Sequence, residues 1–138
     1  MIILDTNVVS ELMRPEPSDA VLHWVGARRS SSLYTTSLTQ AEILHGVRLL
    51  PAGKRRNAVE AAAEAMFHHD FAGRVLPFGS DAARAYARIA AERRRIGRPI
   101  SQFDAQIAAI ADATGAELAT RNTADFERCG IKLIDPWV

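Results

Sequence analysis

Several features are scarce in this sequence, and each scarcity excludes a class of protein. The single cysteine, Cys129, excludes an intramolecular disulfide and a cysteine-based zinc site. The opening apolar run is far too short for a signal peptide or a membrane span, so we expect a cytoplasmic protein that does not contact a membrane. No internal repeat or low-complexity block is visible.

Neither sign of charge is in excess. The chain has 17 basic and 16 acidic residues and a net charge of +1 at pH 7, which argues against a surface that binds polyanions in general. A local basic patch could still bind nucleic acid, and arginine supplies most of the basic residues because only Lys54 and Lys132 are lysines. No aromatic stripe accompanies Trp24 and Trp137, which favours core or interface positions for them over base-stacking platforms.

The remaining composition is that of an ordinary globular protein. Apolar residues make up 48% and charged residues 24% of the 138 residues. This length is enough for one hydrophobic core, so we expect a single domain over residues 1–138.

Strand and helix patterns alternate along the chain. The run Ile2-Ile3-Leu4 has no polar alternation, which is typical of a strand that is buried on both faces of a parallel sheet. We expect further strands at 33–36, 74–78, 117–120 and 131–134, with helices between them. The pattern predicts an α/β fold with a mainly parallel sheet in which helices dominate.

The first strand ends in a lone carboxylate, Asp5. In open α/β sheets the carboxyl ends of the strands form the edge where ligands bind, which makes Asp5 a candidate site residue. The alternative is that Asp5 only starts the turn or caps the next helix, for which Thr6 and Asn7 are also suitable caps.

Two further acids lie where helices are expected to begin. Glu42 follows Thr39 and Asp104 follows Ser101 at capping-box spacing, and each taken alone is explained by capping. Helix N-termini and strand C-termini meet at one edge of a parallel sheet, however, so both acids could join Asp5 there. Such a cluster repels itself unless a divalent cation binds, and oxygen ligands favour Mg²⁺ or Mn²⁺. The reaction best served is phosphoryl transfer with metal-activated water.

These residues, taken together, resemble a known family. The resemblance lies in Asp5-Thr6-Asn7 after an apolar strand, Thr39-x-x-Glu42, Asp104 opening a late helix, and the run Ala119-Thr120-Arg121-Asn122-Thr123-x-Asp125-Phe126. The chain resembles the PIN-domain ribonucleases, and most closely the VapC/FitB toxins of bacterial type II toxin–antitoxin pairs, over nearly its whole length.

The resemblance implies a PIN-like three-layer fold with strand order 3-2-1-4-5 and helices on both faces. It implies a Mg²⁺-dependent endoribonuclease, with Mn²⁺ as a substitute, that forms a homodimer. It also implies a cognate antitoxin protein that blocks the acidic pocket, and contact with DNA only indirectly through that antitoxin.

The resemblance also assigns residues. Asp5, Glu42 and Asp104 carry over as metal-binding acids, and Thr120 as the residue that positions water or the scissile phosphate. Relatives often have a fourth acid where this chain has Asn122, which can bind metal or water through its carbonyl oxygen but adds no charge. Asp125 is the nearest acid, and it either substitutes for the missing carboxylate or caps the turn before Phe126.

The run Arg93-Arg94-Arg95 lies in the last turn of the helix expected at 80–96. Solvated side chains that compensate the helix dipole explain this run better than a contact with RNA.

Three other functions compete with this reading. A haloacid-dehalogenase-like phosphatase needs Asp-x-Asp after its first strand, but the third position here is Asn7. A receiver domain needs adjacent acids after the first strand, and Asp5 stands alone. A PIN-fold binding module with little catalysis, acting through its antitoxin and DNA complex, stays open because the fourth acid is missing.

Overall fold

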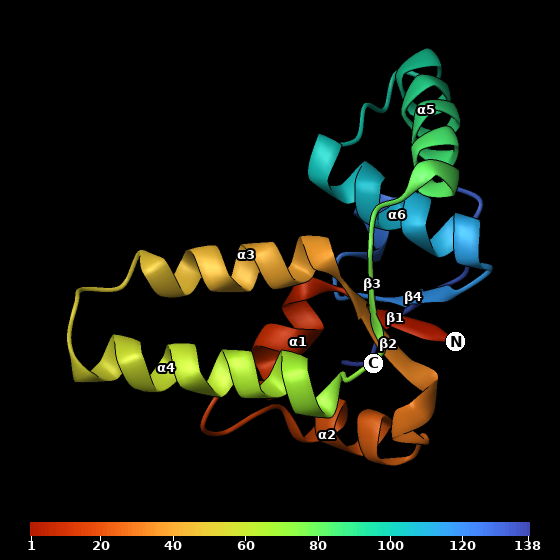
Figure 1. The fold of residues 1–138 in the computed structure, drawn as a ribbon. Helices are drawn as coiled ribbons and strands as arrows, with labels where there is room; N and C mark the ends of the chain where they lie inside the picture. The colour runs from red at the N-terminus through yellow and green to blue at the C-terminus, as the bar shows by residue number, and fades with distance from the viewer.

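The computed structural model describes residues 1–138, and its centre is a five-stranded parallel sheet (Figure 1). The strands are β1 (Ile2–Leu4), β2 (Leu33–Thr36), β3 (Val75–Leu76), β4 (Glu117–Ala119) and β5 (Leu133–Ile134). Their order is β3-β2-β1-β4-β5 and every neighbouring pair is parallel, which confirms the predicted order 3-2-1-4-5.

Strand β1 occupies the middle of this sheet. Ile2 pairs with Leu33 of β2 on one side, and Ile3 pairs with Leu118 of β4 on the other. Ile3 and Leu4 are almost wholly buried, at 0% and 1% exposure, and they belong to different hydrophobic clusters. The apolar run without alternation therefore does form a strand that is covered on both faces.

Helices form a layer on each face of the sheet. Six α-helices are present: α1 (Thr6–Leu12), α2 (Asp19–Gly26), α3 (Ser37–Arg48), α4 (Lys54–Ala65), α5 (Ser80–Arg95) and α6 (Gln102–Thr114). Buried residues of α1 to α4 pack with Leu4, and buried residues of α5 and α6 pack with Ile3. Helices α3 and α4 form a hairpin that extends away from the sheet (Figure 1). This arrangement confirms the three-layer fold.

Helical turns complete the connections. A π-helical turn (Met66–Asp70) continues α4, and short 3₁₀ turns lie at Ser30–Ser32 and Thr123–Phe126. None of the helices combines the length and the apolar character that a membrane crossing requires.

Two of the predicted helix starts are wrong, and both errors have the same cause. Asp5, and not Thr6 or Asn7, caps α1 by accepting the Thr6 N–H at 2.8 Å. Helix α3 begins at Ser37, immediately after β2, and its cap is Thr36. In each case the last residue of the strand or its direct neighbour becomes the cap, so no loop separates strand from helix.

The early start of α3 removes the capping-box explanation of Glu42. The Thr36 hydroxyl accepts the Thr39 N–H at 3.2 Å, so Thr39 is itself capped and is not the cap. Glu42 consequently lies in the second turn of α3, beyond the turn whose free amides need an acceptor. At Ser101 the prediction is confirmed, because its hydroxyl accepts the Asp104 N–H at 3.1 Å.

Candidate active site

Asp5 lies at the carboxyl end of the central strand and is 5% exposed. Its Oδ1 accepts the Thr6 N–H at 2.8 Å, and its Oδ2 accepts the Thr120 hydroxyl at 2.8 Å and the Asn7 side-chain amide at 3.4 Å. All of these donors are neutral. Asp5 therefore caps α1, as the alternative interpretation held, and it is also a buried carboxylate that forms no ion pair.

Thr120 joins β4 to this carboxylate. It is fully buried, and besides donating to Asp5 its Oγ1 accepts the Asn7 amide at 3.2 Å and the Asn122 N–H at 3.1 Å. The Asn7 Oδ1 in turn accepts the Arg121 N–H at 3.2 Å. Sequence reasoning did not include Asn7 among the site residues, although its place two residues after Asp5 was the available signal. We call Asp5, Asn7 and Thr120 the buried half of the site.

Burial raises the pKa of Asp5 from 3.8 to about 6. The hydrogen bonds from Thr120 and Thr6 lower this pKa, while the carboxylates of Asp104 and Glu42 raise it further. Two acids from distant parts of the sequence, Glu42 and Asp104, thus act on Asp5. No cation of the chain offsets their charge at Asp5.

Asp104 lies in the first turn of α6, and burial is also the main reason that its pKa is raised. The Ser101 side chain lowers this pKa, Asp125 and then Glu42 raise it, and Arg93 lowers it. The effect of Asp125 exceeds that of Glu42. Asp104 therefore has two acidic neighbours, and we call Glu42, Asp104 and Asp125 the rim of the site.

Surface hollows connect the rim. Glu42 and Asp104 line one of them together with His45 and Ser101. Asp104 and Asp125 line a second one. His45 has no evident partner in the sequence. It lies beside Glu42 because the two residues are three positions apart on α3.

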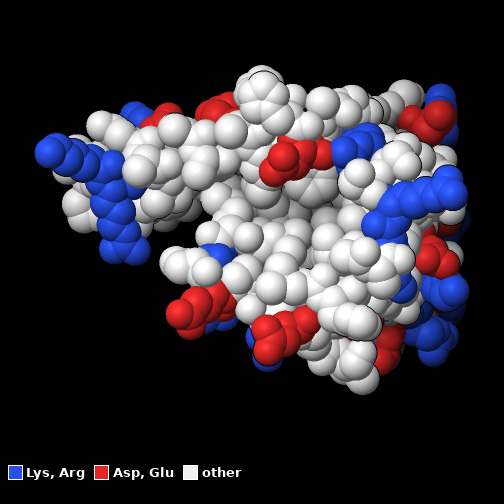
Figure 2. All heavy atoms as spheres, turned by 90° about the horizontal axis from the view of Figure 1, so that it is seen from below, with Lys and Arg blue, Asp and Glu red and all other residues white.

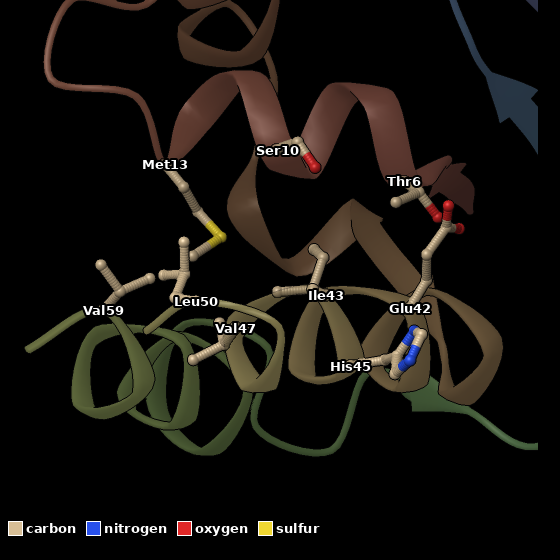
Figure 3. Close-up of a pocket in the computed structure, with 10 residues that line it drawn as sticks. Thr6, Ser10, Met13, Glu42, Ile43, His45, Val47, Leu50 and Val59 are labelled. Carbon is tan, nitrogen blue, oxygen red and sulfur yellow. The ribbon is translucent and has the colours of Figure 1, made fainter. Parts of the chain in front are cut away.

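A third hollow extends from Glu42 along α1, α3 and α4. Figure 3 shows the Glu42 carboxylate pointing toward Thr6 at one end, while Met13, Leu50 and Val59 gather at the other end. This hollow therefore has a polar end at the candidate site and an apolar end between α1 and α4.

The two candidates for the fourth position differ in place. Asn122 is exposed, occupies the cap position of the turn Thr123–Phe126, and accepts the Asp125 N–H through its backbone carbonyl at 3.0 Å. Asp125 lies inside that turn, so the interpretation of Asp125 as its cap is wrong. Its carboxylate is exposed and acts on Asp104.

The donor set suits a hard divalent cation, but the acids are not closely gathered. No group of three or more His, Cys, Asp or Glu side chains lies close enough together to hold a metal ion. Asp5, Glu42, Asp104 and Asp125 form no ion pairs, and burial is the main cause of the raised pKa of Asp5 and of Asp104. Mg²⁺ commonly uses one or two carboxylates and completes its shell with water and phosphate oxygens. The residues fit such an ion without needing a closed cage.

The prediction for Arg93 is wrong. Arg93 is 5% exposed, while Arg94 and Arg95 are exposed as expected, and Arg95 pairs with Glu92 at 2.6 Å. Arg93 faces inward because its guanidinium donates to the nearby Arg98 carbonyl and to the carbonyls of Asp125 and Glu127, which lie 32 and 34 positions further along the sequence. No local pattern could reveal the two distant acceptors.

Basic side chains gather at two ends of one face of the molecule. Figure 2 shows a hollow lined by uncharged residues, with acidic side chains beside it and basic side chains both at the far left end and along the right side. The left end is the tip of the α3–α4 hairpin in both views, where Arg48, Lys54, Arg55 and Arg56 occur. The nearly neutral chain therefore does carry a local basic patch.

Comparisons with known proteins agree with this fold. The model of the PIN domain matches residues 2–132. The chain is 45% identical over 137 residues to VapC ribonuclease Y4jK of Sinorhizobium fredii, covering 99% of this chain and 98% of that protein. It is 37% identical over 137 residues to toxin FitB of Neisseria gonorrhoeae, covering 99% of each.

Solved structures give the same result. A chain in the structure of FitAB bound to a DNA fragment matches with a TM-score of 0.94 and 37% identity, covering 100% of this chain and 96% of that one. A chain of the DNA-bound VapBC from Salmonella typhimurium matches with a TM-score of 0.79 and 28% identity, covering 98% and 97%. Since the family model spans strands β1 to β4 and the helices that carry the acids, the chain belongs to the PIN-domain family, where its relatives are the VapC and FitB toxins.

Proposed function

We propose that residues 1–138 form a single PIN domain that acts as the toxin of a type II toxin–antitoxin pair, a Mg²⁺-dependent endoribonuclease. The observation that carries this proposal is Asp5, a buried carboxylate held only by neutral donors at the ligand-binding edge of the sheet. Asp104 and Glu42 act on it from two helices without any offsetting cation. The names of the relatives, VapC ribonuclease and toxin FitB, support the same function.

The proposed roles follow from position. Asp5 and Asp104 are the direct metal ligands, and Glu42 helps to place metal and water. When bound, Mg²⁺ supplies charge stabilisation and an activated water for attack on the phosphodiester. Each carboxylate oxygen has two lone pairs, so the bonds from Thr6, Asn7 and Thr120 fix the orientation of Asp5 and leave acceptor capacity on Oδ1 for a ligand.

The remaining site residues orient the others. The Thr120 hydroxyl donates to Asp5 and so holds its rotamer, and it is also proposed to position water or the scissile phosphate. Asn122 is proposed to hold water or metal through its amide oxygen, since its side chain forms no hydrogen bond within the protein. Asp125 is proposed as a further ligand, because it lines the same hollow as Asp104 and raises the pKa of that carboxyl.

The proposed partners are an RNA substrate, a second copy of the chain and a cognate antitoxin. Similar solved structures contain VapBC or FitAB, some of them bound to DNA. We propose that DNA is reached only through the antitoxin. An uncompensated acidic site attracts a guanidinium, which binds carboxylates bidentately, so an antitoxin arginine is the expected blocking group.

RNA cleavage by the purified chain tests the proposal. Cleavage should require Mg²⁺ or Mn²⁺, stop with EDTA and be lost in Asp5→Asn. Glu11→Gln is a matched control, because Glu11 is an equally buried acid on α1 whose partners Arg14 and Ser18 lie outside the site. Cleavage that persists in EDTA, or that survives Asp5→Asn, would contradict the assignment.

A binding module with little catalysis is the second candidate. It is favoured by Asn122 at the fourth position and by the absence of a ready three-residue metal cluster. This candidate predicts antitoxin binding without RNA cleavage at any metal concentration, so the same assay separates the two functions.

A further inference from the structure

Arg93 is the only lysine or arginine among the buried residues of the protein. Its guanidinium forms no ion pair and instead donates to three backbone carbonyls. Nε donates to the Arg98 carbonyl at 2.7 Å, and Nη1 donates to the carbonyls of Asp125 and Glu127, each at 2.9 Å. A buried cation is costly unless its donors are satisfied, so this set of acceptors is a specific arrangement.

These bonds join three segments of the chain. Arg93 lies in the last turn of α5, Arg98 lies in the connection to α6, and Asp125 and Glu127 lie in the loop that follows β4. The Arg98 N–H also donates to the Arg93 carbonyl at 2.9 Å, which closes the contact in both directions. We call residues 122–130 the β4–β5 loop.

The joined segments are the walls of the hollow that holds two rim acids. Arg93 lines that hollow together with Ser101, Asp104 and Asp125. Ser101 and Asp104 follow directly after the connection that Arg93 binds, and Asp125 is itself bound through its carbonyl. The place of the Asp125 carboxylate relative to Asp104 thus depends on the Arg93 bonds.

We propose that Arg93 is a positioning residue of the acidic site, which holds the β4–β5 loop against the start of α6 so that Asp125 faces Asp104. The inference rests on the proposed function, because it gives Arg93 a part in the same metal site. The planar guanidinium presents separate donors in fixed directions, and a lysine cannot reach the Arg98 and Asp125 carbonyls in the same way.

Two substitutions of Arg93 test this role against matched controls. Arg93→Lys keeps the positive charge but removes the planar guanidinium with its separate donors. Arg93→Met removes both the charge and the donors. Arg94→Lys and Arg94→Met serve as controls, because Arg94 is the next residue of the same helix and is exposed. If Arg93→Met does not fold, Arg93→Lys decides the outcome.

The first readout is hydrogen exchange of backbone amides. In Arg93→Lys, exchange in the β4–β5 loop should become about tenfold faster or more, because local opening costs less there. Exchange in the core of α6 should stay as in the wild type, and the Arg94 variants should change neither segment. Wild-type exchange in the loop of Arg93→Lys would overturn the inference.

The second readout is the affinity for Mn²⁺, measured by calorimetry without RNA. Residues that orient metal ligands typically contribute about 10–100-fold to metal affinity, and we expect a loss of that size in Arg93→Lys. In an Asp125→Asn background the further loss should be clearly smaller, because both changes act on the same contact. Losses that simply add, or an unchanged affinity in Arg93→Lys, would refute positioning through Asp125.

RNA cleavage separates this inference from the proposed function. If the wild type cleaves, Arg93→Lys should lower kcat by about tenfold or more while KM changes little, which is the pattern of a lost transition-state interaction. If the wild type does not cleave, the proposed function fails, and hydrogen exchange and Mn²⁺ affinity still decide the role of Arg93.

Discussion

The buried half of the acidic site and its rim are built in opposite ways. Asp5 and Thr120 follow adjacent central strands, are almost fully buried, and bond directly to each other. Glu42 and Asp125 are exposed, and they lie on a helix and in a loop. The buried half is therefore fixed by the sheet itself. The exposed side chains of the rim can turn toward a bound ion, even though Arg93 holds the backbone of Asp125. Asp5 thus supplies a preset ligand, and metal and substrate order the side chains of the rim.

The largest expected effect comes from removing a charge in the buried half. Asp5→Asn should lower RNA cleavage by roughly a thousandfold or more, since metal ligation supports several kcal/mol of transition-state stabilisation. The same variant should melt at an equal or higher temperature near neutral pH, because the ionised carboxylate is buried without a cation. Asp104→Asn on the rim should lose activity similarly. A large drop in melting temperature for either variant would favour a purely structural role.

The next effect concerns the hydroxyl that holds Asp5. Thr120→Val should cost about 1–3 kcal/mol of stability, because Asp5 loses a donor and Asn7 loses an acceptor in a buried place. Thr35→Val is the matched control, since the Thr35 hydroxyl is equally buried and donates to the Leu4 carbonyl at 3.1 Å. Chemical denaturation should show comparable losses for both, and cleavage should fall mainly in Thr120→Val. Equal cleavage in the two variants would break the link between Thr120 and the site.

The dependence of stability on pH should reveal the buried carboxylate of Asp5. Between its unfolded pKa of 3.8 and its folded pKa of about 6, Asp5 binds more protons in the folded state. The stabilising contribution of Asp5 to the free energy of unfolding is therefore fully present below the unfolded pKa of 3.8. It is lost as the pH rises through the folded pKa of about 6. The change is on the order of 3 kcal/mol, from about 2 pKa units at 1.36 kcal/mol each. Urea unfolding should show the wild type losing stability relative to Asp5→Asn over this window, and a relative gain would contradict the buried, unpaired carboxylate.

The smallest effects concern the fourth position on the rim. Three carboxylates only partly offset two divalent ions about 4 Å apart, so we expect at most one well-ordered metal before RNA binds. Anomalous density from Mn²⁺ soaked into RNA-free crystals measures this directly. Two fully occupied sites that both avoid Asp125 would be inconsistent with this expectation.

Asn122→Asp should then strengthen binding of a second ion, by an amount that calorimetry can measure. Asn122 already lies beside Thr120 through its backbone, so the new carboxylate would stand at the same edge of the sheet. Thr123→Asp is a suitable control, because it adds the same charge one residue further along the turn. If both variants bind Mn²⁺ as the wild type does, Asn122 does not belong to the site.

Much of the fold could be predicted from local sequence patterns, because the strongest patterns are each typical of one kind of element. The run Ile2-Ile3-Leu4 has no polar residue, which is typical of a strand covered on both faces. The residues at which helices begin were harder to predict from the sequence. Thr36 and Thr39 both suit a cap, and the choice between them depended on where β2 stopped pairing with β3.

For the site, the types of side chain follow from the sequence alone: carboxylates after a buried strand and near helix starts, with Asn122 in the loop after β4. The neighbours of each acid depend on the tertiary structure. The Thr120 hydroxyl meets Asp5 across 115 positions of sequence, and Arg93 meets the Asp125 carbonyl across 32. Such contacts depend on how parallel strands and packed helices bring distant backbone together. A residue type sets which bonds are possible, and the packing of the whole chain selects the partners that satisfy them.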